Sequence, residues 1–337
     1  MKYQWFAGID VSKLQLDITV YKGSERVFYK AISNTVKEIV LFLRQLIQKE
    51  KISMDDCLFC MEHTGIYNSN ILKVMEEQKL SVCLESSVQI KQSGGLQRGK
   101  NDKIDSDRIA LYAYKNKDFL KLWKPERSVI GQLRRLSSMR ERLLNAKKQL
   151  NAGLSEDKKF GNKYLNKQMA ACCRSTIMAI EHDIKKTETA IEAVIESDDQ
   201  LRNLYRIIES VPGVGKVTAT EIIINTNEFK RINDPRKYAC YAGVAPFEHS
   251  SGISVRGKTR VSKKANLKAK SLLHMTSLVA SRFSEDLKAY YERKVAEGKN
   301  KMSILNAIKN KIIHRIFACV NQNRLYQKNY VFNLVES

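Results

Sequence analysis

Four acidic residues could together hold metal ions that act on a phosphodiester bond. Asp10 in WFAGIDVSK and Glu62 in LFCMEHTGIY each close a short apolar, β-prone run. Asp102 and Asp105 lie three residues apart at the start of a helix-like stretch, so both carboxylates share one face. Carboxylates from two strand ends and one helix face suit a pair of hard divalent cations. The pattern therefore predicts a site for Mg²⁺ or Mn²⁺.

The charge of the chain predicts a polyanionic partner. The 337 residues carry a formal net charge of +23, more than solubility requires, so nucleic acid is expected first and an anionic membrane second. The membrane is disfavoured because no stretch approaches about 18 uninterrupted apolar residues. MKYQWFAGID runs straight into a predicted strand without the layout of a signal peptide. We expect a cytoplasmic protein that binds nucleic acid and no membrane.

The seven cysteines fit a reducing compartment, because no secretory signal accompanies them. Cys57 and Cys60 form a C-x-x-C pair, but they lie in a predicted strand, where residues three apart face opposite sides. No second ligand pair follows at zinc-finger spacing. We expect core thiols and no structural zinc.

The first 120 or so residues are predicted to form an RNase H-like α/β fold. Three strands connected by tight turns come first, and then helix, strand, helix, strand and helix alternate. A capping box at Thr35 and Glu38 opens the first helix. In such a sheet the first and fourth strands are neighbours, so Asp10 and Glu62 should converge. The predicted elements are strands 5–11, 14–20, 26–29, 56–62 and 81–84, and helices 35–48, 70–78 and from 102 onward.

The surroundings of the acids were expected to favour phosphate binding. Ala7 and Gly8 are small and would let a phosphate approach Asp10. Asp17 falls inside the second strand and Asp107 points away from the shared helix face, so neither is expected in the site. Basic residues surround the acidic pair and could hold a phosphate backbone or only balance local charge. These are Arg98, Lys100, Lys103 and Arg108.

The middle of the chain predicts two long helices that form an antiparallel coiled-coil hairpin. Apolar residues recur at heptad spacing from Leu136 to Leu150 and again from Ile177 to Val194. The polar stretch 151–166 is expected to be the loop. Such a hairpin could be a spacer, a dimer contact, a nucleic-acid clamp or an internal packing unit.

The segment ESVPGVGKVTA resembles the second half of a helix-hairpin-helix motif. There, backbone N–H groups of a Gly-x-Gly turn bind a DNA phosphate, which makes Gly213, Gly215 and Lys216 candidate contacts. A plain helix–turn–helix corner is the alternative. A P-loop fails, because Ser210 stands where a glycine is needed and Val217 where Ser or Thr must follow the lysine.

A second group of residues could supply a nucleophile. Ser250, Ser251 and Gly252 precede a run without acids, which suits a serine aimed at a DNA phosphate. On composition alone the two serines could equally be a turn, and nothing in the sequence fixes His249 as an activating base. The basic residues of the run are Arg256, Lys258, Arg260, Lys263, Lys264, Lys268 and Lys270.

Taken in order, these motifs resemble the DEDD-type insertion-sequence transposases, the class that includes the Piv/MooV DNA invertases and the bridge-RNA-guided recombinases. The resemblance rests on GIDVSK, EHTG, NDKIDSDRIA, VPGVG, YAGVAP and SSG followed by the basic run. It implies a RuvC-like domain whose acids match Asp10, Glu62, Asp102 and Asp105. It also implies a nucleophilic serine at Ser251, in a composite active centre whose acidic and serine sites come from different protomers.

Further expectations follow from this resemblance. They are DNA as substrate (element ends and target), a structured guide RNA, Mg²⁺ or Mn²⁺ as cofactor, and a homodimer or homotetramer. The implied domains are a RuvC-like domain (1–125), a coiled-coil hairpin (126–200), a mostly α-helical transposase domain (201–320) and a polar tail (321–337). One stretch departs from the family pattern, since SKKANLK has lysines and Ala265 in place of arginines and a glycine.

Three rival functions each explain part of the sequence. A RuvC-like structure-specific endonuclease that uses metal-activated water explains the acids but leaves the C-terminal third without a chemical role. A sugar-kinase or actin-like ATPase would need a second glycine-rich phosphate loop and an adenosine site, and neither is present in the sequence. A non-catalytic nucleic-acid-binding protein would keep its function when Asp10 is mutated.

Overall fold

The chain forms two compact units, Met1–Pro125 and Glu126–Ser337. The computed structural model describes residues 3–93, 101–160, 162–251, 255–261 and 265–328. Each unit has a buried apolar core of its own. No described helix is long and apolar enough to cross a membrane.

A five-stranded mixed sheet forms the centre of the first unit, with strand order β3-β2-β1-β4-β5. The first three strands pair antiparallel, whereas β1 with β4 and β4 with β5 pair parallel. This is the order expected of an RNase H-like sheet, and the first and fourth strands are neighbours as predicted. The strands are β1 (Trp5–Val11), β2 (Gln15–Lys22), β3 (Glu25–Ser33), β4 (Cys57–Glu62) and β5 (Ser81–Glu85).

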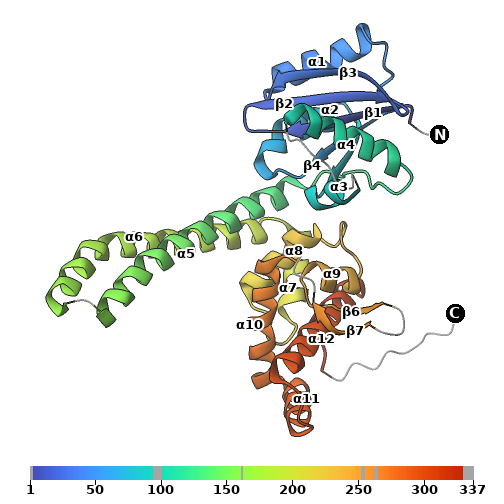
Figure 1. The fold of residues 1–337 in the computed structure, drawn as a ribbon. Helices are drawn as coiled ribbons and strands as arrows, with labels where there is room; N and C mark the ends of the chain where they lie inside the picture. The colour runs from blue at the N-terminus through green and yellow to red at the C-terminus, as the bar shows by residue number, and fades with distance from the viewer. Residues whose placement is uncertain (1–2, 94–100, 161, 252–254, 262–264, 329–337) are drawn as a thin grey trace, which may run out of the picture. The chain divides into compact units, whose positions relative to one another are not determined.

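Helices cover both faces of this sheet (Figure 1). The alternation of side chains along the strands explains why. Ala7 and Cys57 belong to a core shared with α1 and α2, while Phe6 and Cys60 belong to another shared with α4. The two cysteines are thus core residues on opposite faces, as expected. The helices are α1 (Val36–Gln48), the 3₁₀ turn η1 (Gly65–Asn68), α2 (Ser69–Glu77), α3 (Ser87–Ser93) and α4 (Asp102–Asn116).

Two long helices, α5 (Ser128–Phe160) and α6 (Lys163–Glu196), open the second unit. Figure 1 shows them side by side. Arg140 contacts Glu188 at 2.7 Å and Lys147 contacts Glu181 at 2.8 Å. The second pair lies later along α5 and earlier along α6, so the helices run antiparallel. Coiled-coil geometry stays a prediction.

The predicted polar loop at 151–166 is wrong in extent. Helix α5 continues to Phe160 and α6 begins at Lys163, so the connection between them is short. The polar stretch contains good helix formers, including Ala152, Leu154 and Lys158, and these favour a continued helix over a loop. Charge was mistaken for irregular structure, although polar residues such as lysine are also good helix formers.

The rest of the second unit is helical apart from one β-hairpin. Helix α12 lies at its centre, and Ile308, Ile312 and Ile316 on one of its faces are fully buried. The helices pack around a single large apolar core. The elements are α7 (Asp199–Glu209), α8 (Lys216–Thr226), α9 (Pro235–Tyr241), β6 (Pro246–Ser251), β7 (Val255–Val261), α10 (Leu267–Phe283), α11 (Glu285–Ala296) and α12 (Lys301–Asn321).

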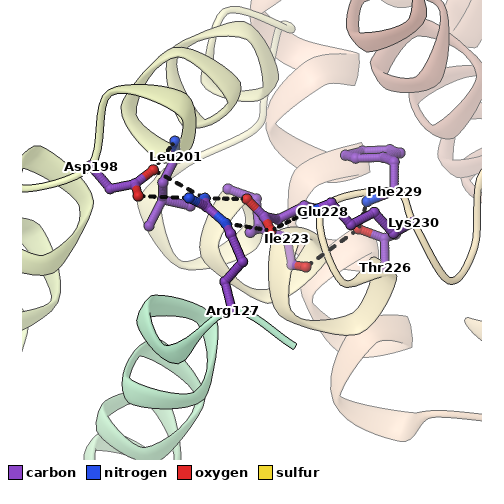
Figure 2. Close-up of polar contacts among 8 residues, drawn as sticks. All are labelled: Arg127, Asp198, Leu201, Ile223, Thr226, Glu228, Phe229 and Lys230. Atoms are coloured by element: carbon purple, nitrogen blue, oxygen red, sulfur yellow. Dashed lines mark hydrogen bonds and ion pairs between the residues drawn. The ribbon is translucent and has the colours of Figure 1, made fainter. Parts of the chain in front are cut away.

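A charged cluster ties three segments of this unit together (Figure 2). Arg127, just before α5, donates to the Asp198 carboxylate at 2.7 Å and to the Glu228 carboxylate at 3.0 Å. Asp198 also caps α7 by accepting from the backbone N–H of Leu201. Glu228 sits in a turn whose three residues, 227–229, all have positive φ, a rare conformation outside glycine. The guanidinium therefore holds a strained turn against two helix starts.

Candidate active site

The first two acids meet at the end of two neighbouring strands. Asp10 lies on β1, and the residue before it, Ile9, pairs with Met61 of the parallel strand β4. Glu62 follows Met61, so Asp10 and Glu62 occupy adjacent positions on the two strands. This is the convergence that the sequence predicts.

The other two acids are placed by the N-terminus of α4. Asn101 caps the helix by accepting from the backbone N–H of Ile104 at 2.8 Å, so the helix begins at Asp102. Asp102 and Asp105 both fall in its first turn. One turn on, the buried hydroxyl of Ser106 contacts that of Thr19 on β2 at 2.8 Å. This bond anchors the acidic end of the helix to the sheet.

Gly8 serves a different purpose from the one predicted. A Cβ built at Gly8 would lie 2.1 Å from the backbone nitrogen of Ala110 and 2.3 Å from the carbonyl oxygen of Ser106. The space beside β1 is therefore filled by the backbone of α4, and Ala7 is fully buried. The expectation that Ala7 and Gly8 admit a phosphate is wrong. Gly8 instead allows α4, with its two acids, to lie directly on β1.

The electrostatics of the site are those of crowded like charges. Burial, together with the negative charges of the other three acids and of Asp17, raises the pKa of Asp10 to about 6. Burial raises the pKa of Glu62 as well, and Asp105 adds to this while the charge of Lys91 opposes it. Lys91 lies on α3, a helix that the sequence reading did not predict.

Several neighbours set the charge around the acids. Asp17, excluded from the site by sequence, pairs directly across from Asp10 on β2, where it accepts hydrogen bonds from Gln15 at 2.9 Å and from the Tyr29 hydroxyl. Lys103 lies 5.2 Å from the centroid of the Tyr29 ring. Arg108 contacts Asp105 at 2.8 Å rather than standing apart from the acids. Lys100 and Arg98 lie outside the described residues.

Asp107 and Asn68 show what sequence reasoning excluded and what it missed. Asp107 accepts from the Tyr21 hydroxyl at 2.8 Å and pairs with Arg26, away from the four acids as expected. Asn68 is buried, and its amide donates to the backbone carbonyl of Glu62 at 3.0 Å. Its oxygen accepts from Thr64. Asn68 thus fixes the loop after β4, and no motif would have identified it.

The donor set fits a hard divalent cation. Four carboxylates supply only oxygen ligands, which suit Mg²⁺ or Mn²⁺. A cation would also relieve the repulsion that raises the pKa of Asp10. Within the described ranges, no three Asp, Glu, His or Cys side chains already stand close enough together to coordinate one ion.

The predicted serine lies in the second unit, at the end of a β-hairpin. Ser251 is the last residue of β6 and pairs with Val255 of β7, and Ser250 pairs with Arg256. Arg256, Lys258 and Arg260 all fall on β7. Gly252, Lys263 and Lys264 are outside the part of the chain that the structure describes.

The two ends of this hairpin are tied together by a tyrosine and an asparagine. The Tyr241 hydroxyl accepts from the Asn266 side chain at 2.7 Å, and the Asn266 backbone N–H donates to the Tyr241 carbonyl at 2.9 Å. Asn266 also caps α10 by accepting from the backbone N–H of Ala269. A capping asparagine could be predicted from sequence, but its bond to a residue 25 positions earlier could not.

The VPGVG segment forms the turn between α7 and α8. Gly213 has φ +86°, and a Cβ there would lie 2.7 Å from the carbonyl oxygen of Thr276 on α10. Gly215 is the N-cap of α8, with open space where a Cβ would be. Lys216 pairs with Glu192 at 2.5 Å. Gly213 is thus required by packing, and a phosphate contact at Gly215 and Lys216 stays a prediction.

Comparisons with known proteins agree with these features. Residues 205–292 match the family model described as "Transposase IS116/IS110/IS902 family", and residues 7–156 match a second model, described as "Transposase", for the DEDD transposases of the IS110 group. The chain is 26% identical over 68% of its length to the "Pilin gene-inverting protein" of Moraxella bovis, covering 69% of that protein. It is 25% identical over 48% of its length to the "Transposase for insertion sequence element IS1111A" of Coxiella burnetii, covering 44% of it.

Among solved structures, RuvC of T. thermophilus bound to a Holliday junction aligns with 36% of this chain and 100% of its own, at 15% identity and a TM-score of 0.28.

The two family matches define the class: the protein is a DNA transposase, an enzyme that cuts and rejoins DNA. The chain belongs to the IS116/IS110/IS902 family of insertion-sequence transposases. Transposases of the DEDD type depend on divalent metal ions.

Proposed function

We propose that this transposase cuts and rejoins DNA with two sets of residues. Asp10, Glu62, Asp102 and Asp105 form the metal-binding set in the first unit. Ser251 is the nucleophile in the second. A structured noncoding RNA directs the enzyme to the ends of its element and to its target.

The convergence of four acids is the observation that carries this proposal. Asp10 and Glu62 occupy adjacent positions on two strands, Asp102 and Asp105 fall in the first turn of α4, and the negative charges of the other three acids contribute to the raised pKa of Asp10. A fold gains nothing in stability from gathering buried like charges, so such a cluster is a candidate functional site. The Gly8 contact and the Ser106–Thr19 bond, which hold α4 in place, support the same conclusion.

Mg²⁺ or Mn²⁺ would be held by the four carboxylates and, when bound, would polarise the scissile phosphate and offset its charge. The chain's own contribution is to position the elements that carry the acids. Asn68 holds the loop of Glu62, and Asn101 sets the first turn of α4. Arg108 is close enough to balance part of the negative charge through Asp105.

The chemical step is a phosphoryl transfer to serine. The Ser251 Oγ–phosphorus bond forms as the bond from phosphorus to the leaving deoxyribose oxygen breaks. The serine proton is released, and the leaving oxygen takes up a proton. The phosphodiester energy is kept in the phosphoserine–DNA link, so strand exchange requires no ATP, in agreement with the absence of a P-loop sequence.

The remaining parts of the proposal concern how nucleic acid is held. Basic residues near both centres would contact the phosphate backbone, in a homodimer or homotetramer that joins sites from different protomers. The four predicted domains, at 1–125, 126–200, 201–320 and 321–337, belong to this proposal. The proposed contacts are Lys100, Lys103, Arg108, Gly215, Lys216, Arg256, Lys258, Arg260, Lys263 and Lys264, with Gly213 shaping the turn.

The first test is recombination in cells. The gene and its native flanking DNA are placed on a plasmid, and recombination junctions are sequenced for wild type, Asp10→Ala and Ser251→Ala. Both variants should lose junctions, while the matched controls Asp107→Asn and Ser250→Ala should keep them. Junctions that survive Ser251→Ala but vanish with Asp10→Ala would mean a nuclease that uses water, and the serine assignment would be wrong.

Two further measurements separate the parts of the proposal. Mn²⁺ should raise the melting temperature of the wild type and not that of Asp10→Asn, because only an intact acidic set binds the ion. Mixing Asp10→Ala and Ser251→Ala protomers should restore junctions if the two sites come from different protomers. No restoration would indicate that both sites act within one chain.

A further inference from the structure

A basic hollow lies in the second unit, away from the β6–β7 hairpin in sequence and formed by other elements. It has a volume of about 310 Å³ and lies between residues of α11 and α12. Asp286, Tyr290 and Arg293 line it from α11. Lys311 and Arg315 line it from α12. Three cations therefore face one carboxylate in a small concave space.

Two of these cations are arranged around one aromatic ring. The Lys311 ammonium lies 4.8 Å from the centroid of the Tyr290 ring, and the Arg293 guanidinium lies 5.7 Å from it. A cation–π contact orients a cation without neutralising its charge. The carboxylate of Glu297 approaches Arg293 only to 4.0 Å, the limit of an ion pair. Both charges remain able to attract an anion.

The third cation, Arg315, is paired within the hollow. One terminal nitrogen of Arg315 contacts Asp286, whose carboxylate also accepts from the Ser284 hydroxyl at 2.7 Å. The guanidinium also lies 5.4 Å from the centroid of the Tyr326 ring. Its other terminal nitrogen, Nη1, is buried and has no hydrogen-bond partner among the described residues. Asp286 is the one carboxylate in the lining, so the excess positive charge of the hollow remains.

We propose that this hollow binds a backbone phosphate of DNA. Phosphate oxygens accept bonds from Lys311 and Arg293, which Tyr290 already orients, and oriented cations lose little freedom on binding. The net positive charge of the lining favours an anion, and the family acts on DNA. The proposal rests on the DNA-transposase assignment but on neither the serine nor the guide RNA. It adds a positioning contact outside the acidic and serine centres.

The test is DNA binding by the full chain, measured by fluorescence anisotropy with a labelled duplex at several salt concentrations. The double variant Arg293→Gln/Lys311→Gln keeps most of each side chain but removes both charges. Losing one phosphate contact should weaken binding about tenfold at 0.1 M salt and reduce the slope of log affinity against log salt by about 0.9. The matched control is Lys288→Gln/Lys301→Gln, which removes two exposed lysines from the same two helices outside the hollow.

Three comparisons decide the outcome. An equal loss of DNA affinity in both double variants would overturn the proposal, because it would show that any surface charge contributes as much. Unchanged DNA affinity in the Arg293→Gln/Lys311→Gln variant would overturn it as well. Arg315→Lys keeps the charge of the lining, so it should bind DNA nearly as tightly as the wild type does. A loss seen with an RNA hairpin but not with the DNA duplex would overturn DNA as the ligand. The hollow variant should still gain melting temperature with Mn²⁺ as the wild type does, so failure of the acidic site and failure of the hollow are separable.

Discussion

The two units hold their charged clusters in opposite ways. Around Asp10 the neighbouring charges are mostly of the same sign, and the pKa of this carboxyl rises to about 6. Around Arg127, positive and negative side chains are paired. Burial alone would raise the pKa of Glu228, but hydrogen bonds from Arg127 and Lys230 outweigh it, so the pKa of Glu228 falls below its ordinary value. The pKa of Asp198 falls as well, first through its hydrogen bond from Arg127.

This difference separates a cluster that the fold tolerates from one that helps to hold it. Like charges that are partly buried destabilise the folded chain, so their presence points to chemistry. Opposite charges with good hydrogen-bond geometry join distant segments, here the starts of α5 and α7 and the turn after α8 (Figure 2). Substitutions among the four acids should therefore lower activity and raise stability, whereas substitutions in the Arg127 cluster should chiefly lower stability.

The largest effect is expected for Asp10→Asn. Recombination should fall by at least ~100-fold, since even residues that only support a metal ligand cost 10- to 100-fold when changed. The unfolding free energy at pH 7 should rise by about 1–2 kcal/mol, because one repelling and partly desolvated charge is gone. Junction sequencing and urea unfolding measure the two quantities. A variant that is both inactive and less stable would contradict the view that the acids repel one another.

Gly8→Ala should damage the acidic cluster without touching an acid. The new Cβ would meet backbone atoms of α4 at 2.1 and 2.3 Å, so the helix bearing Asp102 and Asp105 must move. We expect a loss of about 3 kcal/mol in unfolding free energy together with most of the activity. Gly153→Ala is the control, because Gly153 lies in α5 with nothing near its Cβ position, and alanine there should stabilise by up to ~1 kcal/mol. An active, stable Gly8→Ala protein would show that α4 can shift freely.

Arg127→Ala should lower the unfolding free energy, whereas Asp10→Asn should raise it. The Glu228 side chain is only 1% exposed, so removing its partner leaves a buried charge poorly compensated. A loss of about 2–4 kcal/mol in unfolding free energy is expected. Arg202→Ala, whose partner Asp199 is 91% exposed, should cost less than ~1 kcal/mol. Equal losses in the two variants would place the Arg127 cluster among ordinary surface pairs.

The first unit, which carries the four acids, was the more predictable from sequence. Strand β1 was predicted with the bounds that the structure shows, and the convergence of Asp10 with Glu62 followed from strand order. These features depend on local patterns and on a topology with few alternatives. The role of Gly8 was misread, because which backbone fills the space beside a glycine depends on tertiary packing. Asn68 and Lys91 were missed for the same reason, since neither belongs to a motif.

The Arg127 cluster could not be predicted at all. Its members are separated by 71 and 101 residues, and each is an unremarkable charge in its own segment. Only the packed helices bring them together. The polar stretch after Leu150 shows the converse error, where local composition suggested a loop and the helix simply continued. Local sequence therefore predicts elements better than it predicts the polar contacts between them.

The smallest effect expected is a pH dependence that identifies the carboxylates in the Arg127 cluster. Their pKa values are lowered in the folded chain, so the stability they contribute is present above the pKa of the unfolded chain, near 4. It is lost as the pH falls through the lowered pKa values of the folded state, because the protonated carboxyls no longer attract the guanidinium.

The difference in unfolding free energy between wild type and Arg127→Ala should therefore be constant from pH 7 to about 5. It should narrow by about 1 kcal/mol or more below pH 4. Urea unfolding of both proteins at each pH measures this difference, and Arg202→Ala should show little narrowing because its pair is exposed. A difference in unfolding free energy that stays constant to pH 3 would mean that Arg127 stabilises the turn by packing and neutral hydrogen bonds. The charges of Asp198 and Glu228 would then contribute nothing to stability.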